Sequence, residues 1–129
     1  MPRDYQRKRT KYILPTAVYH QAIWIIRDYQ RMKDRMNDKL GTKSQNLDGM
    51  PHGNGTTDPT FEAAAIREDM ARKIAAIDRS LQLIPPEYRK GIWENIQYGS
   101  PFPEDAERST YGHAKSRFVH EVAVILNLV

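Results

Sequence analysis

Residues 84–128 read IPPEYRKGIWENIQYGSPFPEDAERSTYGHAKSRFVHEVAVILNL, and this stretch decides the fold that the sequence predicts. Pro86 suits the first turn of a helix, and Gly99 suits the position that follows a last turn. One face of the segment between them is apolar, through Tyr88, Ile92, Trp93 and Ile96. The pattern therefore predicts a helix from about Pro86 to Tyr98.

A second helix is expected after a short connector. Pro101 and Pro103 interrupt the helical pattern, and residues 103–106 are compatible with a single helical turn. Ser109 is then expected to cap a last helix over residues 110–128. Its core stripe consists of Ala114, Phe118, Val122 and Ile125, and its other side carries Tyr111, His113, Lys115, Ser116, Arg117 and His120. Such a pair of helices is typical of a helix-turn-helix unit.

Two longer amphipathic helices are expected upstream. The first runs from about residue 16 to 39, because Pro15 favours a helix start and Gly41 a helix end. Its apolar residues alternate in steps of four and three: Val18, Ala22, Ile25, Tyr29, Met32, Met36 and Leu40. The other begins at Asp58 and Pro59, with Asp58 as N-cap, and ends at the Pro85–Pro86 pair. Its stripe is Ala63, Ile66, Met70, Ile74, Ile77, Leu81 and Ile84.

The sequence between these two helices, residues 41–58, is rich in glycine and short polar residues and predicts a loop. Residues 16–84 are therefore expected to form a helical hairpin that packs antiparallel. Seven apolar positions on each helix exceed what two helices can bury alone, so we expect a homodimer through residues 16–84 or cover from the C-terminal helices. Trp24 and Trp93 lie beside apolar stripes and are expected in the core.

No segment alternates between polar and apolar residues with a period of two, so the predicted fold class is all-α: a long helical hairpin followed by a C-terminal helix-turn-helix over residues 85–129. A chain of 129 residues suits one domain with a modest core. The sequence has no cysteine, which excludes disulfides and thiolate metal sites and suits a reducing cytoplasm. No apolar run is long enough to span a membrane, and no secretory signal is expected.

The net charge of +4 is distributed unevenly. Residues 1–15 form a basic arm that carries Arg3, Arg7, Lys8, Arg9 and Lys11. Such an arm and a basic last helix favour a polyanionic partner. A solubilising tail is the alternative interpretation of the arm, and a solvated helix face is the alternative for residues 110–120.

The sequence also resembles a known family at these positions. Ile84, Pro85 and Arg89, then Ser109, Ala114 and the run Lys115-Ser116-Arg117, resemble region 4 of sigma-70-type factors. The whole chain is similar to small phage and prophage late transcriptional regulators of the RinA and ArpU types. It departs from the sigma pattern at residues 100–106, where two prolines occupy the place of a supporting helix.

The resemblance implies a cytoplasmic regulator of phage late genes in a bacterial host, with duplex DNA and host RNA polymerase as partners. The residues expected to contact DNA are Thr110, Tyr111, His113, Lys115, Ser116, Arg117 and His120 on the last helix, and Arg7, Lys8 and Arg9 on the arm. Two alternatives stay open: a helical adaptor or inhibitor protein of phage origin, and a DNA-packaging recognition subunit that also uses a helix-turn-helix.

An enzyme is not expected. The four histidines, at positions 20, 52, 113 and 120, form no zinc-binding motif, and the glycine-rich segment lacks the Lys-Ser/Thr pair of a phosphate-binding loop. Glu104, Asp105 and Glu107 form an acidic cluster before the last helix, where acidic residues suit the helix dipole. We therefore expect no catalytic residue, metal ion or cofactor.

Overall fold

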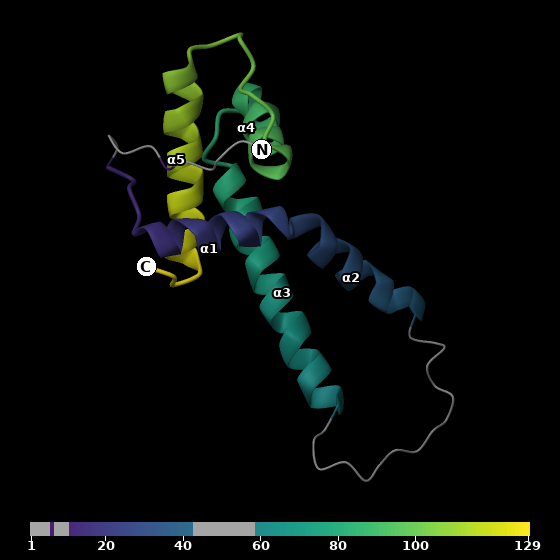
Figure 1. The fold of residues 1–129 in the computed structure, drawn as a ribbon. Helices are drawn as coiled ribbons and strands as arrows, with labels where there is room; N and C mark the ends of the chain where they lie inside the picture. The colour runs from purple at the N-terminus through teal and green to yellow at the C-terminus, as the bar shows by residue number, and fades with distance from the viewer. Residues whose placement is uncertain (1–5, 7–10, 43–58) are drawn as a thin grey trace.

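The computed structural model describes residues 6, 11–42 and 59–129, and this part of the chain forms five helices and no strand (Figure 1). They are α1 Thr16–Arg27, α2 Tyr29–Thr42, α3 Pro59–Leu81, α4 Pro86–Tyr98 and α5 Arg108–Ile125. The predicted all-α fold class is confirmed for these residues. The proline signals also predicted three helix starts correctly, at Thr16, Pro59 and Pro86, whereas Asp58 lies outside the described residues.

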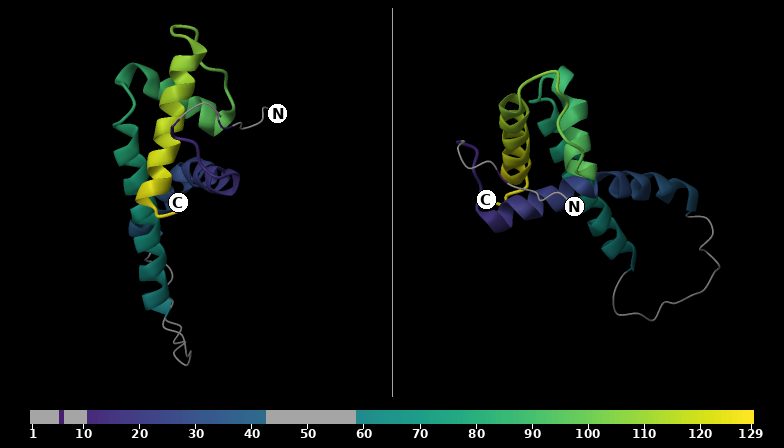
Figure 2. Two further views of the ribbon diagram at one scale, coloured as in Figure 1. Left: turned by 90° about the vertical axis from the view of Figure 1, so that its left-hand side faces the viewer. Right: turned by 45° about the horizontal axis from the view of Figure 1, so that its top comes forward.

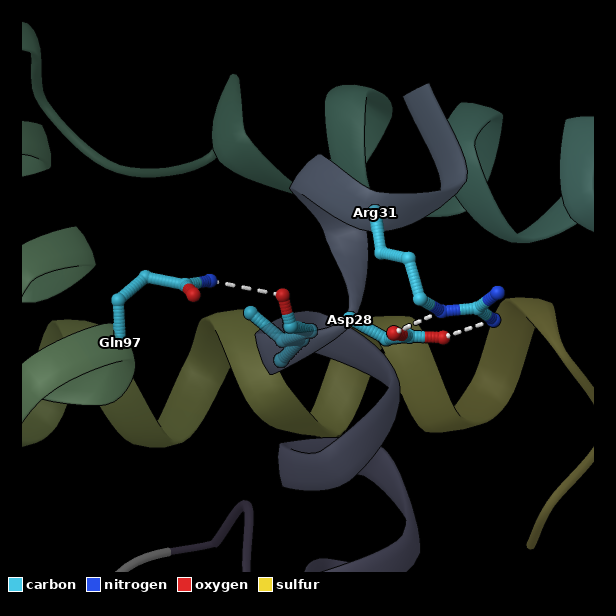
Figure 3. A network of polar contacts seen from close by, with 4 residues as sticks. Asp28, Arg31 and Gln97 are labelled. Carbon is cyan, nitrogen blue, oxygen red and sulfur yellow. Dashed lines mark hydrogen bonds and ion pairs between the residues drawn. The ribbon is translucent and has the colours of Figure 1, made fainter. Parts of the chain in front are cut away.

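The prediction of one helix over residues 16–39 is wrong, because the chain breaks at Asp28 into α1 and α2. Figure 3 shows the polar contacts at this break. Arg31 donates two hydrogen bonds, of 2.6 and 2.7 Å, to the Asp28 carboxylate, and these bonds lower the pKa of Asp28. The side-chain amide of Gln97, on α4, donates a 2.8 Å hydrogen bond to the backbone oxygen of Ile26. A carbonyl at the end of α1 is thus satisfied by another helix, which accounts for a break here.

A reciprocal hydrogen bond joins the same two helices. Arg27 Nε, at the end of α1, donates to the backbone oxygen of Ile96 on α4 at 2.8 Å. The last turns of α1 and α4 therefore satisfy each other's carbonyl groups across about seventy residues of sequence. This pair of hydrogen bonds fixes α4 against the N-terminal part of the molecule.

The loop predicted at residues 41–58 begins later than expected. Gly41 and Thr42 still belong to α2, so the prediction that Gly41 ends the helix is wrong. Glycine disfavours a helix interior by only about 1 kcal/mol, which does not suffice to end one. The rest of this loop prediction falls on residues 43–58, outside the described residues.

One hydrophobic core joins the hairpin to the C-terminal segment. α5 contacts α1, α3 and α4, and its buried side chains lie at the centre of this core. The largest fully buried apolar side chains are Ile23, Ile26, Met32, Ile77, Ile84, Ile92, Ile96, Tyr111, Phe118, Val119 and Val122. Trp93 packs at the edge of the core as expected, with its ring 5.1 Å from that of Tyr29.

Trp24 does not lie in the core, contrary to the expectation, and 64% of its surface is exposed. Its neighbour Ile23 is buried, and successive helical residues point about 100° apart. The apolar face of α1 is therefore narrower than the sequence suggested. The Arg27 guanidinium lies over the exposed Trp24 ring, 5.1 Å from its centre.

The α2–α3 hairpin packs only in part. Tyr29 on α2 donates a 2.6 Å hydrogen bond to Asp78 near the C-terminal end of α3. The far ends of the two helices diverge, as Figure 1 and the right-hand view of Figure 2 show. Phe61 and Ile66, toward the N-terminal end of α3, are 71% and 54% exposed, although Ile66 continues the stripe that is buried at Ile77.

Candidate nucleic-acid interface

The α4–α5 connector, residues 99–107, is irregular. Gly99 ends α4 in the left-handed conformation, with φ of 73°, and its N–H bonds back to the α4 backbone. Asn95 donates a 2.8 Å hydrogen bond to the Ser100 carbonyl, which starts the connector along α4. Residues 103–106 contain a turn and not the predicted helical turn, so no helix lies between α4 and α5.

The predicted cap at Ser109 is wrong by two residues. α5 begins at Arg108, and the backbone oxygen of Glu107 accepts the first hydrogen bonds, from Thr110 and Tyr111. Ser109 is already helical and exposed, so its side chain cannot take the N-cap position.

Tyr111 belongs to the core and not to the outward face of α5, which corrects the prediction that it contacts DNA. Its side chain has no exposed surface, and its ring lies against Phe102 at 5.2 Å and Tyr88 at 5.0 Å. Its hydroxyl donates a 2.6 Å hydrogen bond to Asp105, and this bond together with burial raises the pKa of Tyr111 to about 12. Tyr111 thus attaches the connector to α5, in the place where the sigma-like pattern has a supporting helix.

The run Lys115-Ser116-Arg117 does not share one surface. Ser116 is buried, which corrects the expectation that it faces DNA. Lys115 is half-buried and donates a 2.7 Å hydrogen bond to the side chain of Asn95 on α4. Only Arg117 is fully on the outside, because consecutive helical residues point about 100° apart.

The outward face of α5 consists of Thr110, His113, Arg117 and His120. His113 and Arg117 are exposed, whereas Thr110 and His120 are half-buried. Their steps of three and four residues keep them on one side of the helix. These four side chains offer a ligand one cation, two imidazoles and one hydroxyl.

A groove of about 490 Å³ runs beside this face. One wall comes from the α3–α4 turn and the start of α4, through Leu83, Pro85 and Tyr88. The opposite wall comes from α5, through Ser109, Thr110, His113, Ala114 and Arg117. Arg89, a residue of the sigma-like pattern, does not line the groove and instead donates a 2.8 Å hydrogen bond to the Ile84 carbonyl.

Tyr12, which the sequence did not single out as a site residue, lies on the same face of α5. Its ring centre is 5.9 Å from that of His113 and 5.6 Å from that of His120. The exposed Lys11 places its ammonium 5.3 Å from the Tyr12 ring centre. Arg7, Lys8 and Arg9 lie outside the described residues. Residues 11 and 12 therefore lie beside the outward face of α5.

No group of three histidine or acidic side chains comes together in the described ranges in a way that could hold a metal ion. None of the helices in these ranges combines the length and the apolar character that a bilayer crossing requires.

A scan against protein-family models, a search of curated proteins and a search of solved structures each gave no match for this chain. The likeness to sigma region 4 and to phage late regulators thus depends on the sequence pattern alone.

Proposed function

We propose that this protein binds duplex DNA through the outward face of α5 and regulates the transcription of phage late genes. The observation that carries the DNA-binding proposal is the environment of Arg117. This side chain is exposed on the face that holds Thr110, His113 and His120, and it has no hydrogen bond or ion pair with any other described residue.

Several other cations differ from Arg117 in this respect. Arg31 pairs with Asp28, and both Arg72 and Lys73 pair with Asp69. Arg89 and Arg27 donate to backbone carbonyls of other turns. A guanidinium without such a partner retains its full set of donors for an external acceptor, such as a phosphate or the O6 and N7 atoms of guanine.

The helical geometry suits the major groove, which admits one α-helix with its exposed residues toward the bases. Arg117 would read guanine, and the Thr110 hydroxyl, nearer the helix start, would position α5 on a phosphate. Lys11 adds a second exposed cation beside this face. The sigma-like sequence pattern supports the more specific parts of the proposal. These are binding to promoters, control of phage late genes and a contact with host RNA polymerase.

The test compares two arginine variants in equilibrium binding to a random duplex library and to the sequence that the library enriches. Arg117→Ala removes the proposed base contact, and we expect a loss of about 1–3 kcal/mol in binding, or roughly 5- to 150-fold. Arg72→Ala is the matched control, because it removes the same charge from an exposed position on α3. Circular dichroism checks that both variants keep their helices.

Equal affinities for these two variants would contradict the assignment of Arg117. Absence of salt-dependent binding by the wild-type chain, even at low salt, would contradict DNA binding itself.

A helical adaptor is the second candidate, and exposed apolar side chains favour it. Phe61 and Ile66 present a large apolar surface on the part of α3 that α2 does not cover. Such surfaces often mark protein–protein contacts. Sedimentation equilibrium of the wild-type chain and of a Phe61→Ser, Ile66→Ser variant distinguishes a dimer from a monomer, and a larger assembly would favour the packaging subunit.

A further inference from the structure

The N-terminal segment is fixed to the body of the protein at two points before α1 begins. Leu14 is buried in the hydrophobic core, 5% exposed. Its backbone is paired with the side chain of Gln6: the Leu14 N–H donates to Gln6 Oε1 at 2.6 Å, and Gln6 Nε2 donates to the Leu14 carbonyl at 2.8 Å. The side-chain amide of Gln6 thus forms the pair of hydrogen bonds with Leu14 that the backbone of a neighbouring strand would form, and it links residue 6 to residue 14.

Tyr12 supplies the other attachment. Its ring lies within 6 Å of two imidazoles, those of His113 and His120, which are two turns apart on α5. The half-buried Tyr12 ring therefore holds residue 12 against α5 through two side chains. The Lys11 ammonium lies over the same ring, 5.3 Å from its centre.

The charges around this attachment are mainly positive or neutral. Lys11 and Arg117 are exposed cations, and the half-buried Glu121 is the acidic residue that follows on this part of α5. In the sequence, Arg7, Lys8 and Arg9 occur between the anchored Gln6 and Lys11. A duplex that meets Arg117 would therefore also meet Lys11.

We infer that Gln6 and Tyr12 are positioning residues that fix Lys11 beside the outward face of α5, so that Lys11 and Arg117 contact the phosphates and bases of one duplex. The inference rests on the proposed function and makes it more specific. Lys11 becomes a phosphate-binding residue. Residues 11–14 become a fixed part of the DNA-binding surface.

The test measures how the binding constant for a labelled random duplex changes with salt, for the full chain. Lys11→Ala removes one phosphate contact, so the slope of log K against log salt should decrease in magnitude by about 0.9. Between 50 and 200 mM salt, the affinity of this variant should therefore fall by a factor roughly three- to fourfold smaller than that of the wild type. Tyr12→Ala removes no charge, yet it should reduce the slope by about the same amount, because Lys11 loses its position. Tyr12→Phe keeps the ring and should retain the wild-type slope.

Tyr98→Ala is the matched control, because Tyr98 is 75% exposed at the end of α4 and makes none of these ring contacts, and its slope should equal that of the wild type. Hydrogen exchange without DNA gives an independent readout. Exchange of the Leu14 amide, which donates to Gln6, should become faster in both Gln6→Ala and Tyr12→Ala.

The outcomes separate the two proposals. A wild-type slope in Tyr12→Ala, together with a reduced slope in Lys11→Ala, overturns the anchoring and leaves DNA binding in place. Slow Leu14 exchange in both variants also overturns the anchoring. If the wild-type chain shows no salt-dependent binding, the proposed function fails, and this inference fails with it.

Discussion

Gly91 offers the sharpest test of how α4 packs against the connector and α5. It is buried on α4, and a Cβ atom at this position would lie 2.6 Å from Pro103 Cδ, 2.8 Å from Pro103 Cγ and 2.9 Å from Tyr111 Cε1. All three distances are too short for carbon atoms in contact. Neither obstacle is the free end of a flexible side chain, since Pro103 is a ring and Tyr111 is buried and bonded to Asp105.

The expected cost of Gly91→Ala follows from two opposing terms. Overpacking a well-filled site costs about 1–3 kcal/mol, and the rigid neighbours place this site at the upper end. Alanine is favoured over glycine in a helix by about 1 kcal/mol, which offsets part of that cost. We therefore expect the free energy of unfolding to fall by about 2 kcal/mol, with a decrease of about 8 °C in Tm for a domain of this size.

Urea denaturation followed by far-UV circular dichroism measures this change, and a double-mutant cycle identifies its cause. Pro103→Ala removes the Cγ and Cδ atoms that are closest to the new methyl group. The two substitutions should therefore be coupled by about 1 kcal/mol in favour of the double variant. The reasoning is refuted if Gly91→Ala is as stable as the wild type or more stable, because helix propensity alone predicts that result.

Three further predictions concern single contacts. Folding raises the pKa of Tyr111 to about 12, so the stabilisation from its neutral hydroxyl is complete below the ordinary tyrosine pKa of about 10 and is lost as the pH rises toward 12. Tyr111→Phe should therefore flatten the pH dependence of the free energy of unfolding between pH 10 and pH 12. An unchanged pH profile in this variant would contradict the prediction. Gln97→Ala leaves the Ile26 carbonyl without its 2.8 Å donor and should cost about 1 kcal/mol in urea denaturation, whereas no loss would mean that water replaces the amide. Gly99→Ala should cost about 1 kcal/mol because φ is 73°, and Gly99→Asn should cost less; equal losses would point to a cause other than the left-handed backbone.

Helix starts and ends were predictable from the sequence where a single residue determines them. Pro15, Pro59 and Pro86 each mark the start of a helix, and Gly99 follows the last turn of α4. Such signals are local, because proline fixes φ and glycine tolerates a positive φ. The break at Asp28 was not predictable, since the residue that satisfies the α1 carbonyl there, Gln97, is 71 positions away from Ile26.

The sequence predicted the helix that carries the candidate site, but not which of its side chains are exposed. Tyr111 and Ser116 were expected on the exposed side of α5, and both are buried. The signal for Tyr111 was present, because it precedes Phe118 by seven residues and so continues the stripe through Val122. The position of Tyr12 on His113 and His120 had no local signal, because that contact joins segments about a hundred residues apart.

The central place of α5 in the core has a consequence for biosynthesis. α5 follows the other four helices in sequence, yet it contacts α1, α3 and α4. A ribosome that adds about 5–20 residues per second needs about one to four seconds for the 18 residues of α5. Until then, the apolar faces that α5 will cover stay without their partner, so the nascent chain is most exposed to aggregation and proteolysis just before its fold is completed.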